Sequence, residues 1–175
     1  MAFALPEEII KNLSLNEGMS VADFGAGTGA YSIAAGKLVG SGHVYAIEVL
    51  PDMLPKIKAD ASAHGVFNVE VIRGDIEEEG GTTLATKAVD RVVISNVLFQ
   101  AENKEGVVRE AARVLKPNGL ALVIDWSASY GGLGPSEKDV FPKDKAANLF
   151  LNNGFALAND ISAGDFHYGF LMRRL

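Results

Sequence analysis

The sequence predicts a three-layer α/β/α sandwich built on an open, mostly parallel sheet. Strand-like apolar runs alternate with helical patterns along most of the chain. A glycine-rich turn, Gly25-Ala26-Gly27-Thr28-Gly29, joins the first of these runs directly to a helical pattern. The last two apolar runs are separated only by residues 162–166, too short a connection for a parallel crossover. We therefore expect the chain to end in an antiparallel hairpin at one edge of the sheet.

Composition limits the classes of protein that this chain can belong to. Its 175 residues suit a single domain, residues 1–175, with a short leading helical segment within 1–18. The net charge of −6 and the absence of a basic stripe argue against nucleic acid as a partner. There is no cysteine, which excludes disulfides, thiolate metal sites and a cysteine nucleophile.

Targeting and metal-binding patterns are also missing from the sequence. No signal-peptide pattern and no membrane-spanning apolar run is present, so we expect a soluble cytoplasmic protein without a membrane span. No cluster of carboxylates has metal-ligand spacing, so we expect no metal site.

The first half of the chain reads as helix, strand and helix in turn. Residues 6–13 have the apolar spacing of a short helix, and residues 21–24 form the first strand. Residues 31–38 follow as a helix whose spaced positions are Tyr31, Ala34, Ala35 and Leu38. Residues 43–48 form the second strand. Pro51 suits the first turn of a helix that buries Met53, Ile57 and Ala61.

The second half continues the alternation. Residues 69–72 and 89–95 are the third and fourth strands, separated by a polar stretch, residues 77–87, with at most a weak helical turn. A helix over 105–115 precedes the fifth and most apolar strand, 120–124. A helix over 143–151 ends at Asn153-Gly154. The sixth and seventh strands are 155–161 and 167–172.

Acidic residues follow the second and third strands, where open α/β sheets bind ligands. Glu48 ends the second strand, and its carboxylate can accept hydrogen bonds from ribose hydroxyls. Asp75 follows the third strand and can accept from an exocyclic adenine amine, with the Ile76 backbone beside it. Separately, these acids also suit a solvated strand end and a helix N-cap or turn. Together with the glycine turn, they predict a nucleoside-bearing cofactor.

The sequence resembles the class I, seven-stranded S-adenosylmethionine-dependent methyltransferases over nearly its whole length. Residues 21–29 resemble that family's first motif, Glu48 falls at its ribose acid, and residues 74–76 fall at its adenine acid. Residues 89–98 and 110–120 are similar to its fourth-strand motif and the following helix–turn–strand. Within the family, the branch containing the ubiquinone and menaquinone biosynthesis enzymes is nearest. The resemblance implies a sheet order of 3-2-1-4-5-7-6 with the last strand antiparallel.

The resemblance implies S-adenosyl-L-methionine as cofactor, S-adenosyl-L-homocysteine as product, and a role for each matching position. The glycine turn would approach the methionine part, Glu48 would hold the ribose, and Asp75 would read the adenine edge. Asn96 would contact the methionine amino group through its backbone carbonyl. The implied cofactor-binding residues are Asp23, Gly25, Ala26, Gly27, Tyr31, Glu48, Val49, Asp75, Ile76 and Asn96.

The methyl acceptor implied by the resemblance is a small molecule. Gln100, Trp126 and Tyr130 are candidates for acceptor contact, and His167 and Tyr168 are candidates for a catalytic role. The alternative for His167 is a surface hairpin residue bonded to backbone. No catalytic group is assigned, because displacement from a sulfonium needs a general base only when the nucleophile is still protonated.

Some subclasses of the family are argued against by missing motifs. Residues 95–98 are not Asn-Pro-Pro-Tyr, which argues against methylation of an exocyclic nucleobase nitrogen. The lack of cysteine argues against carbon-5 cytosine chemistry and against arsenite-binding thiols. The short leading segment predicts an open cleft, or one covered by a partner or by a second copy in a homo-oligomer.

Three other functions compete with this interpretation. An NAD-dependent dehydrogenase would use the spacing of Gly25, Gly27 and Ala30, with Glu48 on the adenosine ribose. Asp75 in the base position, the third glycine and the edge hairpin argue against it. An aminopropyl transferase would need an acidic polyamine site, which is not evident. A non-catalytic S-adenosylmethionine-binding protein is the third alternative.

Overall fold

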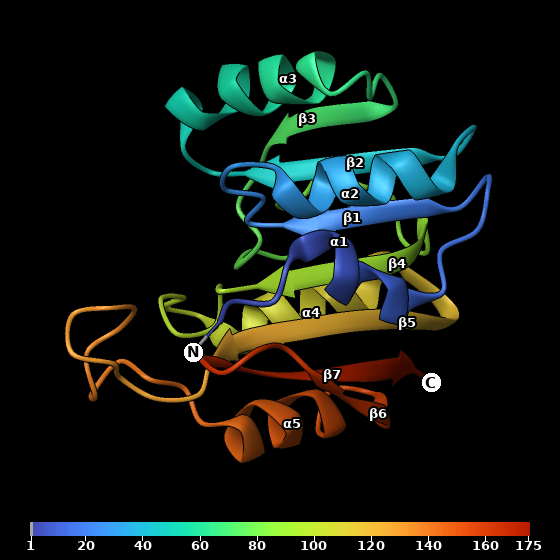
Figure 1. Ribbon diagram of the computed structural model, residues 1–175. Coiled ribbons are helices and arrows are strands. Elements are labelled where there is room, and N and C mark those ends of the chain that lie inside the picture. Colours follow the sequence, from blue (N-terminus) through green and yellow to red (C-terminus); the bar gives the residue numbers. More distant parts are fainter. Residues whose placement is uncertain (1) are drawn as a thin grey trace.

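A computed structural model describes residues 2–175 and places helices on both faces of one seven-stranded sheet (Figure 1). The strand order is β3-β2-β1-β4-β5-β7-β6. Neighbouring strands among β1 to β5 are parallel, and β7 is antiparallel to both β5 and β6. The predicted order and the antiparallel last strand are confirmed. The strands are β1 Ser20–Phe24, β2 His43–Glu48, β3 Val69–Arg73, β4 Val89–Ser95, β5 Leu115–Trp126, β6 Phe155–Ser162 and β7 His167–Arg174.

The helices divide between the two faces of the sheet (Figure 1). Residues of α1, α2 and the 3₁₀ turn η1 pack in one apolar cluster, and those of α4 and α5 pack in another on the opposite side. A short cluster of Ile33, Ala61 and Val66 joins α3 to α2. The helices are α1 Pro6–Ile9, η1 Ile10–Leu13, α2 Ala30–Val39, η2 Pro51–Met53, α3 Leu54–Ala63, α4 Lys104–Val114 and α5 Lys143–Leu151.

The central strands are apolar because both of their faces are covered. In β1, Ala22 and Phe24 pack toward α4, whereas Val21 packs toward α1 and α2. Alternate side chains of a strand point to opposite faces, so a strand between two helical layers has no solvent side. Asp23 is a buried acid within this strand, and it faces the layer of α2. No helix within residues 2–175 has the length and apolar character needed to cross a membrane.

Three elements differ in detail from the expectation. Met53, expected on the buried face of the third helix, lies in the 3₁₀ turn η2 and is only partly buried. Val39, and not Leu38, completes the buried face of α2, and Leu38 is 41% exposed. Strand β5 begins at Leu115, which pairs with Val89. The chain then bulges before Leu120 pairs with Arg91. The glycine-containing segment 116–119, between the predicted helix and the predicted fifth strand, is therefore an irregularity inside the strand pairing.

Candidate functional site

The three glycines of the turn after β1 have different structural roles. All three have left-handed backbone angles, with φ of 68° at Gly25, 56° at Gly27 and 81° at Gly29. A Cβ at Gly25 would lie 2.9 Å from Val97 Cγ2, and one at Gly29 would lie 2.9 Å from Ile57 Cγ2. A Cβ at Gly27 would meet nothing closer than the Gly25 carbonyl oxygen at 3.9 Å. Gly25 and Gly29 are therefore required by packing, and Gly27 faces open space.

Asp23 ties this turn to the helix that follows it. Its Oδ2 accepts a hydrogen bond of 2.6 Å from the hydroxyl of Ser32 in the first turn of α2. Burial raises the pKa of Asp23 to about 6, the Ser32 hydrogen bonds work in the opposite direction, and the charge of Glu48 adds to the rise. Asp23 thus acts as an anchor beneath the turn.

The carboxylate of Glu48, at the end of β2, accepts hydrogen bonds from three backbone N–H groups. Oε2 accepts from Gly27 at 2.9 Å, and Oε1 accepts from Val49 at 2.9 Å and from Leu50 at 3.0 Å. The residue is 7% exposed. A carboxylate offers about four lone-pair positions, so Glu48 retains limited acceptor capacity on Oε2 for a ligand.

Asp75 begins a tight loop after β3. Its Oδ1 accepts from the Glu77 N–H at 2.9 Å, which leaves Oδ2 for another donor. The Asp75 N–H donates to the Gly81 carbonyl, and a Cβ at Gly81 would collide with the Asp75 carbonyl oxygen. The loop is therefore folded closely on itself, and glycine is required where its two sides meet.

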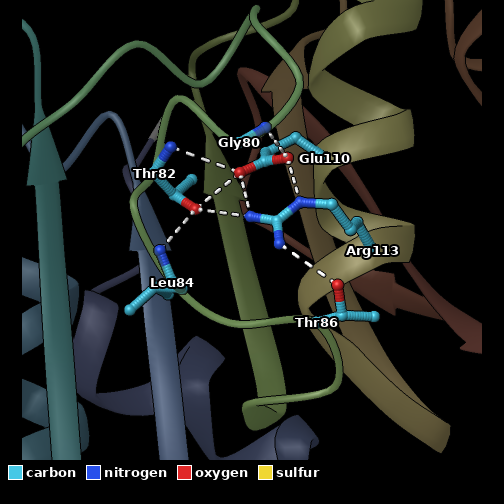
Figure 2. Close-up of polar contacts among 6 residues, drawn as sticks. All are labelled: Gly80, Thr82, Leu84, Thr86, Glu110 and Arg113. Carbon is cyan, nitrogen blue, oxygen red and sulfur yellow. Dashed lines mark hydrogen bonds and ion pairs between the residues drawn. The ribbon is translucent and has the colours of Figure 1, made fainter.

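A buried acid on α4 fixes the far side of this loop (Figure 2). Glu110 is fully buried and accepts from the Gly80 N–H, from the Thr82 N–H and hydroxyl, and from the Arg113 guanidinium. Burial alone would raise the pKa of Glu110, but the hydrogen bonds from Arg113, Thr82 and Gly80 outweigh it and lower the pKa to about 2. Glu110 stays ionised and holds the loop to α4.

These segments enclose a cavity at the carboxyl ends of β1, β2 and β3, which we call the glycine-turn cavity. Its volume is about 380 Å³. Among residues 2–175, three carboxylates line it, from Glu48, Asp75 and Glu77, and no lysine, arginine or histidine does. Its lining residues are Gly25, Gly27, Ile47, Glu48, Val49, Leu50, Met53, Gly74, Asp75, Ile76, Glu77, Val97, Gln100 and Ala101.

A second cavity, the His167 cavity, lies at the carboxyl ends of β4 and β5 and the start of β7. It has a volume of about 150 Å³ and is closed on one side by Phe3, Ala4 and α1. Burial raises the pKa of Tyr31 to about 12, and the Ser95 side chain works in the opposite direction on that pKa. Its lining residues are Phe3, Ala4, Pro6, Ile9, Tyr31, Ser95, Asn96, Ile124, Trp126, Ala163 and His167.

Asn96 stands between the two cavities. It adopts a left-handed conformation with φ of 57° directly after β4, a conformation that asparagine tolerates better than most residues. Its backbone carbonyl accepts a 2.8 Å hydrogen bond from the Gln100 side chain. The carbonyl that the resemblance assigned to the methionine amino group thus already has one partner and keeps one lone pair.

The structure sorts the predicted site residues into three groups. Gly25, Gly27, Glu48, Val49, Asp75 and Ile76 meet in the glycine-turn cavity, and the predicted acceptor residue Gln100 also lies there. Tyr31, Asn96, Trp126 and His167 meet in the His167 cavity. Asp23, Ala26, Tyr130 and Tyr168 line neither cavity.

Two of the outlying residues have other partners. The Tyr168 hydroxyl donates to the Phe141 carbonyl at 3.0 Å, and its ring stacks parallel to Phe170. Tyr130 shares a 2.7 Å hydrogen bond with Ser127 and packs edge-on against Phe166. These contacts place Tyr168 on the α4 and α5 face of the sheet, away from His167.

Most other lining residues had no functional assignment in the sequence, although Val97 falls within the fourth-strand motif, residues 89–98. Phe3 reaches the His167 cavity because its backbone bridges to Gly164 in the β6–β7 turn. Glu77, Val97 and Met53 line the glycine-turn cavity from loops and a 3₁₀ turn. Only the position of Glu77 just after Asp75, at a strand end, marks it out in the sequence.

Comparisons with known proteins point to one family. A family model described as a methyltransferase domain matches residues 15–162. An arsenite methyltransferase of Aquipseudomonas alcaligenes is 33% identical over 61% of this chain and 32% of its own length. A demethylmenaquinone methyltransferase of Staphylococcus aureus is 30% identical over 69% of this chain and 48% of its own length. The chain spans between about a quarter and about half of the length of the first such relatives.

Solved structures support the same assignment. A SAM-dependent methyltransferase from Aquifex aeolicus superposes with a TM-score of 0.87 at 26% identity, over 99% of this chain and 90% of the other. The [4+2]-cyclase SpnF superposes with a TM-score of 0.82 at 14% identity, over 97% of this chain and 79% of the other. The second likeness is one of fold alone.

Proposed function

The chain belongs to the class I S-adenosylmethionine-dependent methyltransferases, and from this premise we propose that it transfers a methyl group to a small-molecule acceptor. The proposed cofactor site is the glycine-turn cavity. The proposed acceptor site lies on the other side of Asn96 from that cavity. One observation carries the proposal: the glycine turn, Glu48 and Asp75 come from three successive strand ends and line a single cavity.

The shape of the glycine-turn cavity suits an adenosine-bearing ligand. Its volume of about 380 Å³ is within the usual range for small-molecule sites. Ile47, Val49 and Ile76 supply apolar surface for a base. Gly27 leaves room for a ligand to approach the backbone closely, since no atom lies where its side chain would be.

The charge of the cavity favours a sulfonium cofactor over a dinucleotide. In the described part of the chain, three carboxylates and no basic side chain line it. S-adenosylmethionine carries a positive sulfonium, which these carboxylates attract, whereas the pyrophosphate of NAD would be repelled. This contrast supports the methyltransferase over the dehydrogenase alternative.

The protein's contribution to such a reaction is alignment and exclusion of water. When bound, S-adenosylmethionine supplies a methyl carbon that is already activated for in-line displacement. Glu48 and Asp75 would fix the ribose and base, and the glycine turn and Asn96 would hold the amino-acid end. Rigid positioning of this kind accounts for much of the rate in bimolecular transfers.

The acceptor class is inferred from relatives and from composition. The relatives act on arsenite and on demethylmenaquinone, both of which are small compared with a macromolecule. This chain has no cysteine. The arsenic of arsenite is a soft element, and soft elements prefer thiolate ligands. We therefore favour an organic acceptor.

Calorimetric titration with S-adenosylhomocysteine, with NAD in a parallel titration, tests the proposed cofactor. We expect micromolar binding of S-adenosylhomocysteine and no binding of NAD. The reverse preference would overturn the proposal. Transfer of a labelled methyl group from S-adenosylmethionine to added phenols then separates an enzyme from a protein that only binds the cofactor.

A further inference from the structure

A buried acid at the end of β5 has no part in the proposed cofactor contacts. Asp125 is fully buried, and it lines neither the glycine-turn cavity nor the His167 cavity. Alternation along β5 places it on the same face as Ala121 and Val123, toward α4 and α5. A buried carboxylate is costly unless its oxygens are hydrogen-bonded, so its partners indicate what the residue does.

The carboxylate of Asp125 joins two segments of backbone. Its Oδ1 accepts from the N–H of the next residue, Trp126, at 2.8 Å, and its Oδ2 accepts from the Phe99 N–H at 3.1 Å. Phe99 belongs to the segment directly after β4, residues 96–101, which we call the β4 loop. The first residue of this loop, Asn96, donates its N–H to the Ile124 carbonyl at 2.9 Å. The end of β5 therefore holds the β4 loop through its backbone and through the Asp125 side chain.

The β4 loop forms one wall of the glycine-turn cavity. Val97, Gln100 and Ala101 line that cavity. The N–H groups of Gln100 and Ala101 both donate to the Val97 carbonyl, so the lining residues form one compact turn. Val97 also lies against the glycine turn, since a Cβ at Gly25 would be 2.9 Å from its Cγ2. A shift of the backbone at Phe99 would therefore move the cavity wall.

Only an ionised carboxylate offers a full acceptor to both N–H groups. Asparagine has one acceptor oxygen, and its NH₂ group would face one of the N–H groups. A protonated Asp125 has a similar defect, because one of its oxygens then carries a hydrogen, and hydrogen bonds to a neutral acceptor are weaker than those to a carboxylate. The hold on the β4 loop therefore depends on the charge of Asp125.

The surroundings of Asp125 set the pH at which that charge changes. Burial raises the pKa of Asp125 to about 6, and the backbone of Trp126, Phe99 and Leu98 and the charge of Lys104 on α4 work in the opposite direction. On β7, Tyr168 lies opposite Asp125 in the strand pairing. Burial, and then the charge of Asp125, raises the pKa of Tyr168, so the phenol stays neutral. Asp125 is thus the group in this cluster that changes its charge near neutral pH.

We propose that Asp125 is a positioning residue, whose carboxylate holds the β4 loop as a wall of the cofactor cavity and whose protonation loosens that wall and weakens cofactor binding. This inference rests on the proposed function, because it takes the glycine-turn cavity as the cofactor site. Asp125 acts through the Phe99 backbone and without touching the ligand. Since linkage is reciprocal, a bound cofactor favours the ionised form of Asp125.

Calorimetric titration with S-adenosylhomocysteine at pH values from 5 to 8 tests the proposal. The affinity of the unsubstituted protein should fall about tenfold between pH 7 and pH 5, because a site whose competent form is about a tenth populated binds about ten times more weakly. Asp125→Asn should bind at pH 7 as weakly as the unsubstituted protein binds at pH 5, with little further change in acid. Asp144→Asn, exposed in the first turn of α5, is the control and should keep the original pH profile.

Lys104→Met gives a second test with a readout that lost packing alone would not produce. Removing the positive charge should raise the pKa of Asp125, so the affinity should begin to fall at a higher pH than in the unsubstituted protein. Urea unfolding shows whether each variant is folded. If Asp125→Asn fails to fold, the profiles of the unsubstituted protein and of Lys104→Met still decide the question.

The outcomes separate the two proposals. Failure of S-adenosylhomocysteine to bind at any pH overturns the proposed function. Binding of constant affinity from pH 5 to pH 8 overturns the role of Asp125 alone. A fall in affinity that survives in Asp125→Asn also overturns that role, because another buried acid, such as Asp23, would then be responsible. A Lys104→Met profile that does not move to higher pH overturns it as well.

Discussion

The backbone N–H of Gly27 donates a 2.9 Å hydrogen bond to the Glu48 carboxylate, which joins the turn after β1 to the end of β2. The same carboxylate accepts from Val49 and Leu50. The residue assigned to the ribose is therefore also the residue that shapes the rim of the cavity. A change at Glu48 should alter both the ligand contact and the backbone around it.

Glu48→Gln should weaken S-adenosylhomocysteine binding and lower stability together. Glutamine has one acceptor oxygen where glutamate has two, so at least one of the three N–H groups loses its partner. We expect a loss of roughly 1–3 kcal/mol in the free energy of unfolding, and an affinity at least tenfold weaker. Urea unfolding and calorimetry measure the two effects. Glu70→Gln, at an exposed position in β3, is the control, and an unchanged affinity in Glu48→Gln would disprove the ribose contact.

Gly27→Ala should abolish binding of S-adenosylhomocysteine but leave the protein folded. The new methyl group would project into the open space where the ligand is expected, and a left-handed alanine should cost about 1 kcal/mol of stability. Gly18→Ala is a matched control, since Gly18 also has a positive φ with no atom within 4 Å of its Cβ position. Both variants should lose similar stability, and only Gly27→Ala should lose binding. Equal affinity in the two variants would make the turn a purely structural feature.

Asp75 should give the protein a preference for adenine over hypoxanthine. Its Oδ1 is occupied by the Glu77 N–H, and Oδ2 remains to accept from an exocyclic amine. We expect S-adenosylhomocysteine to bind roughly tenfold or more tightly than S-inosylhomocysteine, which lacks that amine. Asp75→Asn keeps the acceptor for Glu77 and presents an amide N–H₂ to the ligand, so the preference should fall. The idea fails if both proteins discriminate equally.

Glu110 should make stability fall in acid. Its pKa is about 2 in the folded protein and 4.5 in an unperturbed chain. A lowered pKa contributes stability that is present above pH 4.5 and is lost as the pH falls toward 2, amounting to roughly 3 kcal/mol. Urea unfolding from pH 2.5 to pH 7 measures this slope. Glu110→Gln should be less stable at pH 7 and should show a shallower decline in acid, whereas parallel curves would show that another group is responsible.

The fold and the larger part of the proposed cofactor site can be predicted from the sequence for a common reason. Each βα unit has its own periodicity, and a parallel sheet brings the ends of its strands to one edge. The glycine turn, Glu48 and Asp75 all sit at such ends, so their meeting in one cavity requires only the strand order. That order came from the family resemblance and is confirmed by the pairing of the strands.

Some contacts could not be predicted from the sequence. They join segments that do not belong to one periodic sequence pattern. In the sequence, Glu110 cannot be told apart from any other acidic residue of a helix. Its partners Gly80 and Thr82 lie in a loop without regular secondary structure. Phe3 reaches its cavity through a bridge to Gly164, at the other end of the chain. Tyr168 was paired with His167 as a candidate, but neighbouring residues in a strand point to opposite faces.

Strand β7 is made after β6 but lies between β5 and β6 in the sheet. A nascent chain that has emerged from the ribosome only as far as β6 therefore has no partner strand for it, and the apolar surface beneath α5 stays open. The later pairing of β7 with β5 joins residues that are far apart in the chain, and such contacts form slowly. We expect this protein to complete its folding only after synthesis has passed β7, with the β5 edge as the surface most exposed to misassembly until then.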